Sequence, residues 1–282
     1  MMKERIQKVL ADMGLGSRRE IERWIEQGRI TINGKMASLG DKVCSRDRVT
    51  VDNQPVALRE SKQQATRVIA YHKPEGEIST RSDPGNRPTV YQRLPKLEVG
   101  RWISIGRLDI NTSGLILFTN NGELAHRLMH PSNQIERVYA VRVFGEVSEQ
   151  AIESLLQGVE LEDGKAHFEK IIHTGGDGSN QWYRVSIKEG RYREVRRLWE
   201  SVGVTISRLI RIAYGGVALE RNLRKGQWRD LSEKQIAMLA KNVDLPLPAL
   251  RNTDREVNGE QQQPRRRSFN RAPQRRLNRR RA

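Results

Sequence analysis

Hydrophobic and polar residues in the first sixty positions follow a helical spacing and then a strand-like one. Apolar residues recur at helical spacing between residues 6 and 13, which predicts a short helix. Ser17 is expected to begin a second helix, because Glu20 three residues later completes a capping box. Alternating residues around an Asn-Gly pair then predict a hairpin over residues 30–36. The pattern indicates a compact unit of two helices and a hairpin.

The central part of the chain has more strand-like than helix-like stretches. Apolar runs or alternation predict strands within residues 67–76, 101–109, 114–118, 137–147, 167–175, 181–190 and 206–216. Helical spacing is limited to residues 121–130, 149–158 and 194–203. Because strands and helices do not alternate strictly, we predict an α+β fold with a mostly antiparallel sheet rather than a doubly wound parallel one.

Composition divides the chain into three parts. We predict a small domain over residues 1–60, a larger domain over 61–246 and a disordered basic tail over 247–282. A polar linker at residues 58–67 separates the first two.

The chain carries a formal net charge of +17 over 282 residues. Nine arginines and no acidic residue lie between Pro264 and Ala282. Such charge favours a polyanionic partner, and we expect the tail to add non-specific, salt-dependent affinity for nucleic acid. A membrane is the weaker choice, because no apolar run approaches the roughly 20 residues of a spanning helix and no signal peptide is evident.

Cysteine and histidine usage predicts neither disulfides nor a metal site. Cys44 is the single cysteine, which fits a reducing cytoplasm. The five histidines do not form a ligand cluster.

One carboxylate stands out in this basic chain. Asp109 lies in the segment GRLDINTSGLILF, in a turn directly before a fully apolar run. A loop aspartate is usually a turn or capping residue, so residue type alone leaves both a structural and a chemical role open.

Several separated segments share a resemblance to one family. YHKPEG, RPTVYQRLP, GRLDINTSGLILFTNNGELAHRLMHP, ERVYAVRV and EGRYREVRRLWESVG resemble, in this order, the motif series of the RsuA-type bacterial ribosomal RNA pseudouridine synthases. The N-terminal unit is similar to the S4 RNA-binding domain often attached to them. The likeness covers roughly residues 3 to 240 and implies isomerisation of a uridine to pseudouridine, without a redox cofactor or a metal. Large-subunit (23S) RNA is favoured over small-subunit RNA as the substrate.

The resemblance implies catalytic roles for three residues. Asp109 corresponds to the family's aspartate, which attacks the sugar or assists departure of the base. Tyr139 corresponds to the family's active-site tyrosine, and Arg196 corresponds to a basic residue that pairs with the aspartate. A cation there would keep Asp109 ionised and oriented through charge-assisted hydrogen bonds. Taken alone, Tyr139 is equally well a core residue of an alternating strand, and Arg196 one of several solvated arginines.

Three further residues are predicted around the substrate. Leu209 is similar to the apolar residue that lines the uracil pocket, although alone it reads as a core leucine. Arg107 is expected to reach phosphate or to fill the space left by a flipped base, and Lys73 to serve the active-site loop.

Basic residues outside this pocket are predicted to contact RNA phosphates. They are Arg18, Arg19, Arg23, Arg29 and Lys35 in the S4-like unit, together with Arg197. Such a surface suits recognition of RNA shape better than base readout.

Two functions remain to be separated. The first is a cytoplasmic, monomeric pseudouridine synthase that acts through Asp109 on ribosomal RNA or a pre-ribosomal particle. The second is an S4-type RNA-binding or ribosome-assembly factor without catalysis. The presence of Asp109, Tyr139 and Arg196 together favours the enzyme.

Overall fold

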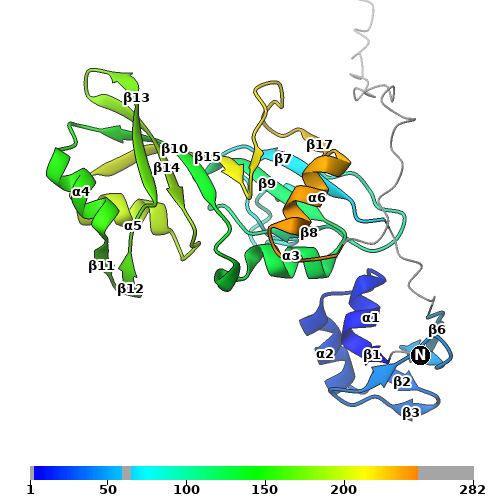
Figure 1. Cartoon of the computed structure of the whole chain (residues 1–282). Coiled ribbons are helices and arrows are strands. Elements are labelled where there is room, and N and C mark those ends of the chain that lie inside the picture. Colours follow the sequence, from blue (N-terminus) through cyan, green and yellow to red (C-terminus); the bar gives the residue numbers. More distant parts are fainter. Residues whose placement is uncertain (1–2, 59–64, 247–282) are drawn as a thin grey trace, which may run out of the picture. The chain divides into compact units, whose positions relative to one another are not determined.

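The computed structural model describes residues 3–58 and 65–246 of the chain (Figure 1). The predicted basic tail, and residues 59–64 of the predicted linker, lie outside the described residues. Hydrophobic side chains of the N-terminal unit, from Ile6 to Val49, form a core of their own, and the larger unit contains two other core clusters. The N-terminal unit therefore has a hydrophobic core separate from those of the larger unit.

The N-terminal unit has two helices and two small sheets. Its elements are β1 (Glu4–Arg5), α1 (Ile6–Asp12), α2 (Arg18–Glu26), β2 (Ile30–Ile32), β3 (Lys35–Met36), β4 (Lys42–Val43), β5 (Val49–Val51) and β6 (Gln54–Val56). The predicted capping box is confirmed: Ser17 Oγ accepts from the amide of Glu20 at 3.1 Å, and Glu20 Oε2 accepts from the amide of Ser17 at 3.1 Å. The predicted hairpin is also confirmed, with Asn33 and Gly34 both at positive φ between β2 and β3.

The larger unit is built on a nine-stranded sheet. Its strands are β7 (Val68–Lys73), β8 (Ile103–Ile105), β9 (Ser113–Thr119), β10 (Arg137–Phe144), β13 (Lys170–Asp177), β14 (Asn180–Ile187), β15 (Thr205–Tyr214), β16 (Val217–Ala218) and β17 (Trp228–Asp230). The main order is β13-β14-β10-β15-β9-β7-β17, with β8 on β9 and β16 on β15. Among these described strands only the β9–β15 pair is parallel, which confirms the predicted α+β fold.

Helices pack against the two halves of this sheet in separate cores. They are η1 (Val90–Arg93), α3 (Gly122–Met129), η2 (Pro131–Asn133), α4 (Glu149–Gln157), α5 (Glu194–Ser201) and α6 (Glu233–Lys241). Side chains of α3 and α6 pack with β7 and β9, whereas those of α4 and α5 pack with β10, β14 and β15 (Figure 1). The sequence analysis did not predict α6 or the small hairpin of β11 (Val159–Leu161) and β12 (Gly164–Ala166). The capping box of Ser232 and Gln235 was the available signal for α6.

Candidate active site and RNA-binding surfaces

Asp109 lies in a turn whose backbone is held by a buried lysine. The turn joins β8 to β9, and the Asp109 carbonyl accepts from the Thr112 amide at 3.1 Å. Lys73, at the end of β7, is fully buried, and its Nζ donates to the carbonyls of Asp109 at 3.0 Å and Thr112 at 2.8 Å. The same ammonium reaches the carbonyls of Pro74 at 3.0 Å and Ile110 at 3.4 Å. Four carbonyl dipoles thus replace the water lost by the buried charge.

Burial also changes the acidity of Lys73. Desolvation lowers its pKa to about 8, and the carboxylates of Glu77, Asp109 and Glu75 partly oppose that effect. The structure therefore places Lys73 beneath the Asp109 turn, where the sequence expected it to serve the loop.

The Asp109 carboxylate itself makes no hydrogen bond or ion pair with any residue in the described part of the chain. A capping or turn aspartate would accept hydrogen bonds from nearby backbone amides. Here only the Asp109 carbonyl is used to build the turn, so the partly exposed carboxylate stays available. This geometry argues against the purely structural reading of Asp109.

Leu108 anchors the turn from the N-terminal side. It is buried, and Ser79 Oγ both donates to its carbonyl at 2.8 Å and accepts from its amide at 3.2 Å. Arg107 on the other side of this anchor is exposed and pairs with no described residue. Arg107 can therefore reach a ligand that approaches Asp109.

Arg196 approaches the turn from the first helical turn of α5. Its guanidinium donates to the carbonyls of Asn111 at 3.0 Å and Ile206 at 3.4 Å. The expected charge-assisted hydrogen bond to Asp109 does not form among the residues described: Nη1 and Nη2 donate to backbone carbonyls, and the buried Nε has no partner there. Burial lowers the pKa of Arg196, Arg193 lowers it further, and Asp109 raises it. The two charges thus interact through space without touching.

Tyr139 and Leu209 lie on the neighbouring strands β10 and β15 of the sheet. Tyr139 on β10 pairs with Arg211 on β15, and Leu209, two residues along β15, shares its face. The two side chains are 8% and 4% exposed and belong to the same core cluster. The Tyr139 hydroxyl has no hydrogen-bond partner within residues 3–58 and 65–246.

Gly114 and Arg211 were missed by the sequence analysis. Arg211 pairs with Gly114 on β9, and Gly114 pairs with Lys73 on β7. Because Tyr139 pairs with Arg211 from the other side, one row of the sheet runs from Lys73 to Tyr139. A Cβ on Gly114 would lie 2.3 Å from the Arg211 carbonyl oxygen, and its φ is +112°. Only glycine allows this approach. An arginine on the inward face of an alternating strand was the available signal for Arg211.

Arg211 is a buried cation near the base of the Asp109 loop. Its side chain is 2% exposed, Nε donates to the Leu115 carbonyl at 2.7 Å, and its guanidinium carbon lies 5.1 Å from the Tyr214 ring centre. A Cβ on Gly106, three residues before Asp109, would be 3.8 Å from Arg211 Nη1. The guanidinium therefore supports the loop from within the protein.

Two of the predicted RNA contacts are engaged by carboxylates. Arg197 Nη1 and Nη2 each donate to Asp163 at 2.8 Å, which fastens α5 to the β11–β12 hairpin. Arg29 donates to Asp52 at 2.7 and 2.5 Å and lies over the Trp24 ring at 5.0 Å. Both arginines support the fold locally, and we leave them out of the RNA surface proposed below.

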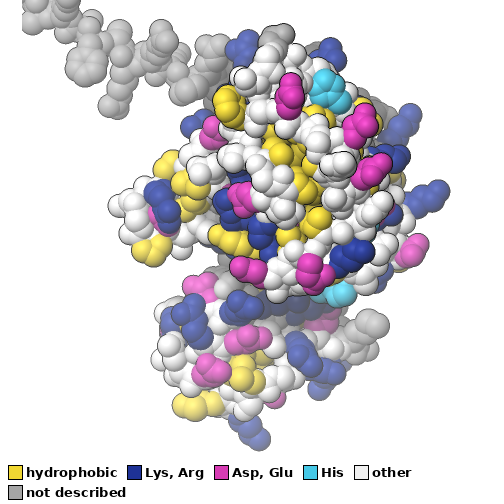
Figure 2. Space-filling view, turned by 90° about the vertical axis from the view of Figure 1, so that its left-hand side faces the viewer, with side chains coloured by type: hydrophobic (Ala, Val, Ile, Leu, Met, Phe, Trp, Pro, Cys, Tyr) yellow, Lys and Arg dark blue, Asp and Glu magenta, His cyan; other side chains and the backbone are white. Residues whose placement is uncertain are grey.

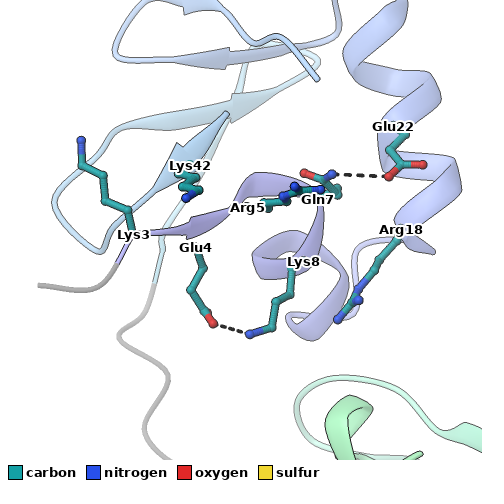
Figure 3. A pocket seen from close by; sticks show the side chains of 8 residues that line it. All are labelled: Lys3, Glu4, Arg5, Gln7, Lys8, Arg18, Glu22 and Lys42. Atoms are coloured by element: carbon teal, nitrogen blue, oxygen red, sulfur yellow. Dashed lines mark hydrogen bonds and ion pairs between the residues drawn. The ribbon is translucent and has the colours of Figure 1, made fainter. Parts of the chain in front are cut away.

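The other basic residues predicted in the N-terminal unit, Arg18, Arg19, Arg23 and Lys35, are exposed. Arg18 also lines a groove of about 360 Å³ between β1, α1, α2 and β4 (Figure 3). Lys3, Arg5, Lys8 and Lys42 line the same groove, which Glu4 and Glu22 only partly neutralise. These basic residues were not singled out in the sequence, because they become neighbours only when β4 pairs with β1.

The described part of the chain shows neither a metal-binding cluster nor a membrane-spanning helix. No three histidine, cysteine or acidic side chains come together there as a possible metal site. No helix within residues 3–58 and 65–246 has the length and apolar character needed to cross a membrane.

Comparison with known proteins gives consistent matches. The sequence model of the RNA pseudouridylate synthase family matches residues 67–201, and that of the S4 domain matches residues 4–49. Ribosomal large subunit pseudouridine synthase B of Escherichia coli (strain K12) is 55% identical over 247 residues, which cover 87% of this chain and 85% of that protein. The protein of the same name from Pseudomonas aeruginosa is 52% identical over 263 residues, covering 92% and 68%. A solved pseudouridylate synthase structure aligns with a TM-score of 0.58 at 27% identity, covering 83% of this chain and 99% of that one.

Proposed function

Because the chain belongs to the RNA pseudouridylate synthase family and carries an N-terminal S4 domain, we propose that it converts one uridine of large-subunit ribosomal RNA to pseudouridine. Relatives that are 52–55% identical carry the name ribosomal large subunit pseudouridine synthase B, which supports this substrate. The observation that carries the proposal is an unpaired carboxylate, Asp109, on a turn whose backbone is held by buried Lys73.

The reaction needs no outside reactant. The bond between the ribose C1′ and the uracil N1 breaks, the base rotates, and a C1′–C5 bond forms. C5 loses a proton and N1 gains one. A carboxylate can assist either by attacking C1′ or by stabilising positive charge as the base departs. Asp109 suits both routes, because no described residue competes for its oxygens.

The neighbouring residues complete the proposed site. Tyr139 offers a ring for stacking on an extruded base and a hydroxyl for proton transfer. Leu209 lines the base pocket on the same sheet face. Arg196 orients the turn through the Asn111 carbonyl and places a positive charge near Asp109.

The target uridine must leave its stack before the carboxylate can reach its ribose. Exposed Arg107, two residues before Asp109, is placed to hold a phosphate or to occupy the vacated space. The S4 unit supplies a second contact through its exposed basic residues and the groove of Figure 3. We place this activity in the cytoplasm, with the protein acting as a monomer on ribosomal RNA or a pre-ribosomal particle.

The substitution Asp109→Asn tests the proposal. It keeps the size of the side chain but removes the charge, so release of tritium from RNA labelled at uracil C5 should fall to background while RNA binding stays within about twofold. Asp230→Asn is the matched control, because Asp230 is exposed on β17 and, among the described residues, its carboxylate pairs only with Arg67. Full tritium release by Asp109→Asn would refute the role of Asp109. A wild-type protein that binds RNA but releases no tritium would favour the non-catalytic assembly factor.

A further inference from the structure

The sheet half made of β13, β14, β10 and β15 has one covered face and one uncovered face. Val141, Val143 and Val185 point to the covered face and join a core with Leu198 and Trp199 of α5. Side chains of the intervening positions point the other way. No described element buries them, since the positions on β10 alternate between buried and partly exposed.

Strand register arranges the uncovered side chains in two rows. One row runs Trp182–Arg142–Arg208 across β14, β10 and β15, and the next runs Ile172–Arg184–Ala140–Ile210 across β13, β14, β10 and β15. We call these seven residues the open sheet face. Ile172 is 49% exposed. Phe144, two residues after Arg142 at the end of β10, is 66% exposed and lies on the same side of that strand as Arg142. Seen from the side that bears β13 and α4, basic, acidic and hydrophobic side chains lie interspersed at the surface (Figure 2).

The charges on the open sheet face have one sign. Three of its seven residues are arginines and none is acidic. Arg142 and Arg208 are direct cross-strand partners, an arrangement that destabilises a sheet unless an anion lies between the charges. Arg184 is diagonal to Arg142 on the neighbouring strand, which adds a third charge to the same patch.

Carboxylates within the described chain do little to neutralise these arginines. Arg142 Nε donates to the Ser207 hydroxyl at 2.9 Å, and Arg184 has no ion pair there. Arg208 has one weak contact, with Glu75 Oε1 at 4.0 Å. Arg197 on the opposite face instead holds Asp163 with two hydrogen bonds of 2.8 Å. Cations left without internal partners are available to an external anion.

Aromatic surface accompanies the charge. The Arg142 guanidinium carbon lies 5.9 Å from the centre of the Trp182 ring, and Phe144 is largely exposed nearby. Cations that bind phosphates, interleaved with aromatic rings that stack on bases, are typical of surfaces that bind single-stranded or irregular RNA.

We propose that the open sheet face binds the RNA that flanks the target nucleotide. This inference rests on the proposed function and extends it to a contact surface distinct from both the catalytic turn and the S4 unit. Glu75 provides the continuity: it contacts Arg208 and lies in the loop that follows β7, two residues after Lys73, whose ammonium holds the Asp109 turn. RNA that leaves the active site beside this loop meets Arg208 first and then Arg142 and Arg184.

A double substitution tests the proposal. Arg142→Gln with Arg184→Gln removes two positive charges from the open sheet face. The matched control is Arg221→Gln with Arg224→Gln, which removes two exposed charges from another surface. We call the Arg142→Gln/Arg184→Gln protein the face variant. For RNA that includes the flanking nucleotides, its KM should be about tenfold higher than that of the wild type, while its kcat at saturating RNA should change less than twofold. The slope of the logarithm of the association constant for this RNA against the logarithm of salt concentration should fall in magnitude by about 1.5 in the face variant. The control variant should match the wild type in KM and in this slope.

Two further measurements keep the inference falsifiable. RNA trimmed to the target loop should bind the wild type and the face variant equally, because it cannot reach the open sheet face. Equal KM values for the face variant and its control on the long RNA would overturn the proposal. Sedimentation showing a wild-type dimer that becomes monomeric in the face variant would also overturn it, because the face would then be a self-association surface. Because KM requires turnover, the Kd of the long RNA is also measured without turnover and should rise by a similar factor in the face variant. That result stands apart from the outcome for Asp109→Asn.

Discussion

The Asp109 turn and the open sheet face both depend on positive charge, but the charge has different surroundings. Under the turn, the buried ammonium of Lys73 donates to four backbone carbonyls, and Arg196 donates to the carbonyl of Asn111. On the open sheet face, Arg142 and Arg184 are solvent-accessible and have no carboxylate partner in the described chain. The enclosed cations hold the backbone of the Asp109 turn, whereas the solvent-accessible cations of the open sheet face can bind a ligand.

The largest effect is expected where the charge is buried. Lys73→Met leaves the carbonyls of Asp109 and Thr112 without their strongest donor, which should lower the free energy of unfolding by about 2–4 kcal/mol. Displacement of the turn should also lower kcat by at least about 100-fold. Urea denaturation and tritium release measure the two effects. Lys96→Met, at an exposed loop position, is the control. A Lys73→Met enzyme with normal kcat would show that the turn holds without the ammonium.

The pH dependence of stability sharpens the same point. The pKa of Lys73 is lowered to about 8 in the folded protein by burial, whereas in the unfolded chain it returns to about 10.4. Between these values the unfolded state holds more protons, so the free energy of unfolding should rise with pH. The cost of burying the charge is present in full below pH 8 and is relieved above it.

The measurement compares the wild type with Lys73→Met by denaturant titration from about pH 7.5 to 10. Because other titrating groups are common to both proteins, their difference isolates Lys73. The wild type should gain stability relative to the variant across this range. Parallel curves would show that the pKa of Lys73 is not lowered.

A smaller contrast is expected between Arg197, whose side chain is 20% exposed, and the exposed Arg184. Arg197→Gln removes the bidentate pair with Asp163 and should cost at most about 1 kcal/mol of stability, with KM for RNA unchanged. Arg184→Gln removes no internal partner, so stability should be preserved while KM for the long RNA rises about threefold. Thermal unfolding measures the change in stability of each variant, and steady-state kinetics measure the change in KM. A stability loss in Arg184→Gln together with a raised KM in Arg197→Gln would mean that the roles of these two arginines were assigned the wrong way round.

Local rules made much of the fold predictable. Ser17 and Glu20 specify a helix start by contacts within four residues, and Asn33-Gly34 specifies a hairpin by its backbone conformation. Alternation along β10 and β14 was read correctly, because each strand has one face in the core. The aspartate of the proposed site could also be found, since its segment is long and chemically distinctive.

The partners of individual charged residues could not be predicted in this way. Arg196 was expected to bond the Asp109 carboxylate, but it donates to the carbonyls of Asn111 and Ile206. Arg197, its neighbour in sequence, binds Asp163 instead of remaining free. Which carbonyl or carboxylate meets a guanidinium depends on segments that are distant in the chain.

The sequence by itself determined the fold class and the family and singled out the carboxylate that we propose as catalytic, because these rest on local periodicity, turn chemistry and a distinctive segment. Only the tertiary structure decided which cations are enclosed and which face solvent. Strand register aligns Lys73, Gly114, Arg211 and Tyr139 in one row, and it gathers Arg142, Arg184 and Arg208 on the open sheet face. The physical reason is that the energy of a charge depends on its surroundings, and those surroundings come from strands far apart in the chain.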